Sequence, residues 1–176
     1  MKTLVVYKSK SGASMYYAEE IARALGGESR HYRSIPREGG YDLVIYAAGV
    51  NGGKVDSLAA MKKALAPLGK RFLTAASCLR EPTGEYRREV AKKSGLREEE
   101  LVLMRGRMNM ARLGIWDRLL LRMVRAKIDR KAEREKTQED REIYNALSFP
   151  TSFTDVKYIL PLVKKARAME EESEAK

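Results

Sequence analysis

The chain has 176 residues, of which 44% are hydrophobic and 34% are charged, and its formal net charge is +11. This length fits one domain with a sizeable core and is too short for two domains of ordinary size. No apolar run reaches the 18 residues of a membrane span, and the short apolar stretch after Lys2 lacks the cleavage site of a signal peptide. The positive charge favours acidic partners such as nucleic acid, an anionic membrane surface or an acidic protein.

The cysteine and histidine counts exclude two further classes of protein. Cys78 is the only cysteine, so no intrachain disulfide can form, which is compatible with a reducing compartment. Together with the single histidine, His31, it gives too few ligands for a conventional zinc site. We therefore expect a cytoplasmic protein without a metal centre.

Strand and helix patterns alternate along the first 105 residues. Continuous apolar runs predict strands, and apolar residues at helical spacing predict helices. Their alternation predicts an α/β fold, in which a doubly wound sheet of five parallel strands carries helices on both faces. The predicted strands are residues 2–8, 29–33, 42–48, 71–76 and 100–105, and the predicted helices are residues 13–25, 57–66, 84–93 and 154–169.

These elements predict a single domain over residues 1–169. After the fifth strand comes a basic stretch, residues 107–136, which we interpret as an amphipathic insertion. Within it, residues 130–138 are polar throughout and predict a mobile connection or an extension of a basic helix. Residues 170–176 are rich in glutamate, and we expect them to form a disordered acidic tail.

A hydroxyl-rich turn joins the first strand to the first helix. Ser9, Ser11 and Ser14 surround Gly12 at the point where the helix begins. A helix N-terminus presents unpaired N–H groups and a partial positive charge, and glycine lets the backbone approach a ligand closely. The spacing is neither a dinucleotide fingerprint nor a P-loop, and it suits a single phosphate ester such as that of flavin mononucleotide (FMN). The alternative is an ordinary serine-capped helix start.

Two further loops leave the same edge of the predicted sheet, because the carboxyl ends of parallel strands lie together. They are residues 49–54, which begin with a flexible glycine-rich loop over residues 49–53, and residues 77–83. In a doubly wound fold the ligand binds beyond this edge. We expect the cofactor to contact Ser9, Lys10, Ser11, Gly12, Ala13, Ser14, Gly49, Val50, Asn51, Gly52, Gly53, Ser77, Cys78 and Leu79.

These residues resemble the flavodoxin-like family, whose phosphate loop has the spacing seen at Ser9, Ser11, Gly12 and Ser14. The run from Tyr41 to Tyr46, followed by Gly49, is similar to the family's third strand and flavin-edge loop. The resemblance covers residues 1–105 and the terminal helix, and it implies FMN as the cofactor. Residues 107–121 are similar to the region after strand five in the menaquinone-dependent protoporphyrinogen oxidases, which carry a basic insertion of this kind.

The chain departs from electron-carrier flavodoxins in two ways. Neither loop beside the expected flavin contains an aromatic residue, so the flavin face would be open to a substrate. The chain is also basic where many flavodoxins are acidic, and positive charge favours an anionic reduced flavin. We therefore expect a higher two-electron potential than that of acidic flavodoxins, which suits a quinone acceptor.

The basic insertion contains a predicted helix over residues 116–128. A helical wheel gathers Trp116, Leu119, Leu120, Met123 and Val124 on one side and Arg118, Arg122 and Arg125 on the other. One interpretation packs the apolar side on the sheet and leaves the arginines in solvent. A second places Trp116, Arg118, Arg122 and Arg125 on a surface that meets an anionic membrane or a partner, and a third is self-association. No nucleic-acid-binding signature is visible, so we expect no nucleic acid.

We therefore expect an FMN-dependent oxidoreductase that oxidises protoporphyrinogen or a similar organic substrate with a quinone as acceptor. It would be cytoplasmic, with peripheral contact at the inner face of the membrane as an option. No side chain is a convincing catalytic acid or base. The alternatives are a flavodoxin-type electron-transfer protein that docks to an acidic or membrane redox partner, and an adaptor that has lost its flavin. Cys78 is a candidate redox thiol near the flavin edge, although lone cysteines more often serve packing.

Overall fold

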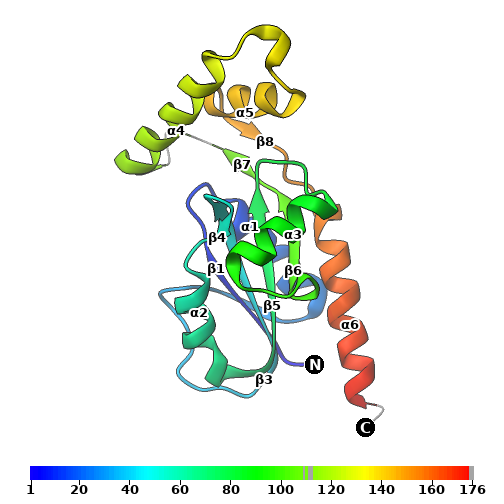
Figure 1. The fold of residues 1–176 in the computed structure, drawn as a ribbon. Helices are drawn as coiled ribbons and strands as arrows, with labels where there is room; N and C mark the ends of the chain where they lie inside the picture. Colours follow the sequence, from blue (N-terminus) through cyan, green and yellow to red (C-terminus); the bar gives the residue numbers. More distant parts are fainter. Residues whose placement is uncertain (109, 111–112, 175–176) are drawn as a thin grey trace.

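The computed structural model describes residues 1–108, 110 and 113–174 of the chain (Figure 1). Asn109, Ala111 and Arg112, which belong to the stretch similar to the protoporphyrinogen oxidases, lie outside the described residues. The strands are β1 (Thr3–Lys8), β2 (Glu28–His31), β3 (Tyr41–Asn51), β4 (Lys54–Val55), β5 (Gly69–Cys78), β6 (Leu101–Arg105), β7 (Arg107–Met108) and β8 (Thr151–Ser152). The α-helices are α1 (Ala13–Leu25), α2 (Leu58–Leu65), α3 (Gly84–Ser94), α4 (Ile115–Asp129), α5 (Gln138–Ser148) and α6 (Leu160–Glu174).

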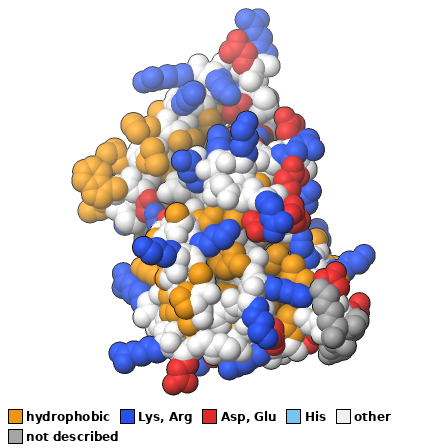
Figure 2. Space-filling model, turned by 60° about the horizontal axis from the view of Figure 1, so that its bottom comes forward, with side chains coloured by type: hydrophobic (Ala, Val, Ile, Leu, Met, Phe, Trp, Pro, Cys, Tyr) orange, Lys and Arg blue, Asp and Glu red, His pale blue; other side chains and the backbone are white. Residues whose placement is uncertain are grey.

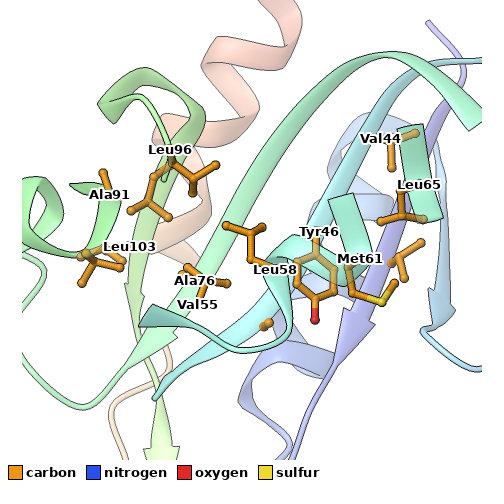
Figure 3. Close-up of a cluster of buried hydrophobic side chains, with 14 of the residues drawn as sticks. Val44, Tyr46, Val55, Leu58, Met61, Leu65, Ala76, Ala91, Leu96 and Leu103 are labelled. Atoms are coloured by element: carbon orange, nitrogen blue, oxygen red, sulfur yellow. The ribbon is translucent and has the colours of Figure 1, made fainter. Parts of the chain in front are cut away.

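Five parallel strands form the central sheet in the order β2-β1-β3-β5-β6. Alternate residues of β3 point to opposite faces, so Val44 and Tyr46 pack on one side while Leu43 and Ile45 pack on the other. Helices α2 and α3 cover the first face, whose buried side chains are drawn in Figure 3, and α1 and α6 cover the second. The predicted α/β fold with helices on both faces of a five-stranded parallel sheet is confirmed.

The glycine-rich segment after β3 is a hairpin, so the prediction of a flexible loop over residues 49–53 was wrong. Strand β3 continues to Asn51 and turns back into β4, with Asn51 opposite Lys54. Gly52 and Gly53 occupy the turn with φ angles of 58° and 78°. A two-residue hairpin turn with positive φ at both positions favours glycine, which explains the composition that suggested flexibility.

The C-terminal helix is displaced from its predicted bounds. A 3₁₀ turn, Val156–Ile159, precedes α6, which continues to Glu174. The prediction of a disordered tail was therefore wrong for residues 170–174, while residues 175 and 176 lie outside the described part of the chain. Glu170 forms an ion pair with the amino group of Met1, which fixes this part of the helix beside the start of β1.

The insertion after β6 is a separate layer at the carboxyl end of the sheet (Figure 1). We call residues 107–152 the α4–α5 region. Strands β7 and β8 pair antiparallel at its base, with Arg107 opposite Ser152, and α4 packs against α5. Helix α5 begins at a capping box in which Thr137 and Asp140 bond each other's backbone N–H groups.

Candidate functional site

A cavity of about 270 Å³ lies at the carboxyl ends of β1, β3 and β5, close to the lower end of the roughly 300–1,000 Å³ of small-molecule sites. The three loops expected at this edge all contribute to it, and the α4–α5 region supplies a further wall. The lining residues are Lys8, Lys10, Ser11, Ser14, Gly49, Val50, Asn51, Gly52, Gly53, Asp56, Ser77, Cys78, Leu79, Arg80, Tyr86, Gly106, Arg107, Met108, Leu113, Asp117, Leu120 and Leu121.

The turn before α1 is held in shape by its own hydroxyl groups. Gly12 adopts φ 89°, and its N–H donates to Ser9 Oγ at 3.0 Å. The first helical bond runs from the Tyr16 N–H to the Gly12 carbonyl, so the N–H groups of the residues between them have no partner within the helix. The buried Ser14 hydroxyl is 3.0 Å from Ser77 Oγ, which ties the turn to the end of β5.

The predicted cofactor residues differ in their relation to the cavity. Lys10, Ser11 and Ser14 line the cavity, and so does every residue in the two predicted segments 49–53 and 77–79. Ser9, Gly12 and Ala13 are not among its lining residues. Their place in the turn shows why: Ser9 bonds back to the backbone, and Ala13 is buried in the helix start.

The cation predicted for this turn is engaged elsewhere. Lys10 Nζ lies 2.7 Å and 2.9 Å from the two carboxylate oxygens of Asp117 on α4. This ion pair links the turn to the insertion across the cavity. Lys8 is likewise paired, with Asp56 at 3.2 Å and with Ser57 Oγ at 2.6 Å.

Cys78 lines the cavity but is not a reactive thiol. Its side chain is buried, and its Sγ lies 3.4 Å and 3.5 Å from the carbonyl oxygens of Arg80 and Met104. Burial raises the pKa of the Cys78 thiol to about 12, although Arg105 and Arg80 partly oppose the shift. Because the thiolate is the reactive form, this position acts as a packing residue near neutral pH.

Several lining residues were missed by our sequence analysis. The loops contain no aromatic residue, but α3 brings Tyr86 to the cavity, with the Arg80 guanidinium 4.2 Å from its ring centre. Arg107 and Met108 come from β7, directly after the predicted fifth strand. Helix α4 adds Leu120 and Leu121, which the amphipathic pattern placed on an insertion without relating it to the ligand site.

The apolar side of α4 is largely exposed, so the interpretation that packs it on the sheet was wrong, and Leu120 on this side also lines the cavity. Trp116 is 83% exposed and Met123 59%, while Ile128, on another side, is buried. Arg118 donates to the Leu113 carbonyl at 2.8 Å, and Arg125 lies over the Tyr144 ring with its Nη2 3.2 Å from the hydroxyl. In Figure 2 hydrophobic side chains gather at the left edge of the molecule, with Lys and Arg side chains nearby.

The single histidine of the chain does not belong to the cavity. His31 packs against the rings of Tyr7 and Tyr32 and does not line the cavity. Within the described part of the chain, no group of three or more His, Cys, Asp or Glu side chains is arranged to hold a metal ion. None of the described helices is both long enough and apolar enough to cross a membrane.

Comparison with known proteins identifies the family but not a branch within it. Among solved structures, the chain is similar to a flavodoxin from the domain Archaea, with 13% identity over 84% of this chain and 97% of that one (TM-score 0.41). It is also similar to a WrbA-like flavodoxin from Agrobacterium tumefaciens, with 12% identity over 84% and 93% of the two chains (TM-score 0.42). A third is rubredoxin oxygen:oxidoreductase from Desulfovibrio gigas, with 13% identity over 84% of this chain and 36% of that one (TM-score 0.42).

A search of curated proteins finds no match to this sequence. A family model described as a flavodoxin domain matches residues 4–136. This match does not select the protoporphyrinogen oxidases. Because it spans β1 to β7 and most of the insertion, the chain belongs to the flavodoxin domain family.

Proposed function

We propose that this protein binds FMN in the cavity at the carboxyl end of the sheet and acts as an FMN-dependent oxidoreductase. The family binds flavin, typically FMN. The observation that carries the proposal is the convergence of the three predicted loops with the N-terminus of α1 on one cavity. When bound, FMN would supply the transfer of hydride or electrons.

The turn before α1 fits the phosphate group. Ser11 and Ser14 line the cavity, and the helix start offers backbone N–H donors with a partial positive charge. The left-handed conformation of Gly12 and the bond from its N–H to Ser9 Oγ fix the shape of the turn. A site whose donors are fixed in advance loses less entropy on binding, so this turn is suited to hold a phosphate.

The remaining walls fit a flat, largely apolar ring. Val50 and Leu79 come from the two loops at the flavin edge, and Leu113, Leu120 and Leu121 come from the insertion. These side chains would exclude water from one side of the ring, which strengthens electrostatic interactions inside the site. The β3–β4 hairpin lines the same cavity and would orient the ring.

The same walls support a proposal for the substrate class. Apolar side chains together with the cationic group of Arg80 would suit an organic substrate with a conjugated ring and anionic substituents, such as a porphyrinogen. The positive surroundings favour the anionic reduced flavin and therefore a quinone as acceptor. An electron-transfer protein docking to an acidic or membrane redox partner is the alternative, and it requires no substrate space beside the flavin.

Flavin binding is tested first by mixing purified protein with FMN and measuring flavin fluorescence and absorbance. We expect saturable binding to the wild type. Ser11→Ala combined with Ser14→Ala should weaken it, because each hydrogen bond to a charged group is worth about 1.5–3 kcal/mol. Ser29→Ala on β2, away from the cavity, is the matched control. Absence of FMN binding to the folded wild-type protein would refute the proposal.

The reaction is tested under anaerobic conditions with protoporphyrinogen and a menaquinone analogue. Turnover of both supports the oxidoreductase. Flavin that exchanges electrons with protein partners but oxidises no organic substrate would instead support the electron-transfer alternative. A midpoint potential as low as that of acidic flavodoxins would contradict the quinone acceptor.

The exposed face of α4 favours a second role, attachment to an anionic lipid surface. Its large apolar side chains project into solvent, and the protein has a net charge of +11. Apolar side chains enter the interface while each Lys or Arg near an anionic surface contributes about 1 kcal/mol. We name Trp116, Arg118, Arg122 and Arg125 as the contact residues.

Co-sedimentation with vesicles tests this attachment. We expect binding to phosphatidylglycerol-containing vesicles and little binding to pure phosphatidylcholine. Arg118→Glu with Arg122→Glu should abolish it, whereas Lys63→Glu with Arg88→Glu makes the same charge change on α2 and α3 and should weaken it less. Failure of the wild type to bind anionic vesicles, together with dimerisation in solution, would assign the face to self-association.

A further inference from the structure

Arg107 places its guanidinium against the turn that begins α1. Its Nη2 donates a hydrogen bond to the Gly12 carbonyl. A Cβ at Gly12 would lie 2.7 Å from Nη2 and 3.1 Å from Cζ of this arginine. Arg107 also lines the cavity. The guanidinium therefore occupies the space beside the turn that glycine leaves open.

The neighbouring cationic side chains pair with carboxylates, but Arg107 does not among the described residues. Lys8 and Lys10 each pair with a carboxylate, at 3.2 Å and 2.7 Å, and Arg80 pairs with Glu139. Among the described residues, no carboxylate lies within ion-pair distance of Arg107. Its Nε is buried and has no hydrogen-bond partner in the described structure. Leaving a buried donor of a charged group unpaired costs free energy, so an anion bound beside this guanidinium would be stabilising.

The backbone around Arg107 holds its position firmly. The Gly106 N–H donates to the Cys78 carbonyl at 2.6 Å, and the Gly106 carbonyl accepts from the Phe153 N–H at 3.0 Å. Arg107 itself lies in β7, opposite Ser152 of β8. The chain is thus fixed on both sides of the arginine, and the side chain approaches the turn from a strand rather than from a loose loop.

We propose that Arg107 binds the 5′-phosphate of the flavin and makes the site selective for FMN over riboflavin. This inference rests on the proposed FMN binding. A guanidinium presents several N–H donors in a planar fork that matches a phosphate, and Arg107 uses one of them on Gly12. The phosphate would lie between this fork and the N-terminus of α1, and it would pair the arginine that the protein leaves without a carboxylate.

The test compares FMN with riboflavin, which lacks the phosphate, by fluorescence titration of the same protein samples. In Arg107→Gln we expect the Kd for FMN to rise on the order of 10- to 100-fold, the equivalent of one charge-assisted hydrogen bond. The Kd for riboflavin should stay within about twofold of the wild type, since its ring site is unchanged. Arg107→Lys keeps the charge without the fork and should fall between the two.

Arg167→Gln is the matched control, because Arg167 on α6 also donates to a backbone carbonyl, that of Ala24, but does not line the cavity. It removes the same charge and should leave both affinities unchanged. Unchanged FMN affinity in Arg107→Gln would overturn the proposal. An equal loss of affinity for FMN and for riboflavin would also overturn it, and would mean that Arg107 has a structural role or contacts the rest of the ligand. If Arg107→Gln does not fold, the ratio of the FMN Kd to the riboflavin Kd in Arg107→Lys serves as the test instead. A wild type that binds neither flavin would instead refute the proposed function.

Discussion

The sheet buries its apolar side chains, whereas helix α4 of the α4–α5 region exposes many of its own. In the sheet, β1 and β3 bury nearly every apolar residue between two layers of helices. In the α4–α5 region, α4 has an equally apolar side, yet Ile115, Trp116 and Met123 are more than half exposed. The sheet is therefore stabilised mainly by burial, whereas the insertion buries fewer apolar side chains, among them Ile128 and Leu147, and also depends on polar contacts.

Those polar contacts are concentrated at a few places on the carboxyl edge of the sheet. Arg105 lies 2.6 Å from Glu142 of α5 and 3.2 Å from Glu81, and its guanidinium stacks 3.9 Å from the Phe153 ring centre. Lys10 and Asp117 add an ion pair on the other side of the cavity. We therefore expect the insertion, a wall of the site, to loosen without unfolding of the sheet.

The largest effect should come from two identical substitutions, one in each region. Leu73 on β5 is 2% exposed and Leu119 on α4 is 50% exposed. Leu73→Ala should lower the free energy of unfolding by about 2–5 kcal/mol, because it leaves a cavity in the core. Leu119→Ala should change it by less than about 0.5 kcal/mol. Urea denaturation measures both values.

Protein concentration supplies the control for this pair. If Leu119→Ala lowered the free energy of unfolding as much as Leu73→Ala at all protein concentrations, the outward orientation of α4 would be contradicted. A loss that appears only at high concentration would show that the face is covered by a second copy of the chain.

The sheet could be predicted from the sequence because its signals are local. The apolar run of residues 3–7 and the spacing of residues 13–25 each identify one element, and α1 has the predicted bounds. Parallel pairing then brings the three loops to one edge whatever the details of each loop. The hairpin at Gly52 and Gly53 was missed because the same glycines suit a flexible loop and a tight turn.

The insertion could not be predicted in the same way, because its packing depends on contacts across the fold. A helical wheel shows that α4 has an apolar side, but not that this side is turned to solvent. Arg107 reaches Gly12 across 95 residues of sequence, and nothing in the local pattern marks that contact. Tyr86 likewise enters the cavity from the side of α3, although the adjacent loops lack aromatic residues.

A smaller effect is expected where the insertion is attached. Arg105 is only 12% exposed, and its Nη2 bonds the Leu79 carbonyl as well as Glu142. Arg105→Gln should favour local opening of the α4–α5 region by about 1–3 kcal/mol, because it leaves these acceptors unpaired. Amide hydrogen exchange should accelerate in α5 and remain slow in β3.

Arg87→Gln is the matched control, since Arg87 forms only an exposed pair with Glu98 at 3.7 Å. Exposed pairs of this kind contribute about 0–1 kcal/mol. Equal acceleration in α5 and β3 after Arg105→Gln would mean that the two regions open together, and the distinction between them would fail.

The smallest effect should appear on acidification, at the start of α5. The hydrogen bond from Lys131, followed by that from the Thr137 N–H, lowers the pKa of Asp140 to about 2. In the unfolded chain an aspartate titrates near 3.9, so the folded state binds this proton less readily. The stabilisation is therefore complete above about pH 4 and is lost as the pH falls towards 2.

Asp42 provides the comparison in the sheet, because the N–H of Lys2 and the side chain of Lys70 also lower its carboxyl pKa. Asp140→Asn imitates the protonated state at neutral pH, and we expect faster amide exchange in the first turn of α5. Asp42→Asn should leave the exchange of β3 unchanged, because buried side chains on both faces hold that strand. Equal responses would contradict the view that polar contacts stabilise the insertion while burial stabilises the sheet.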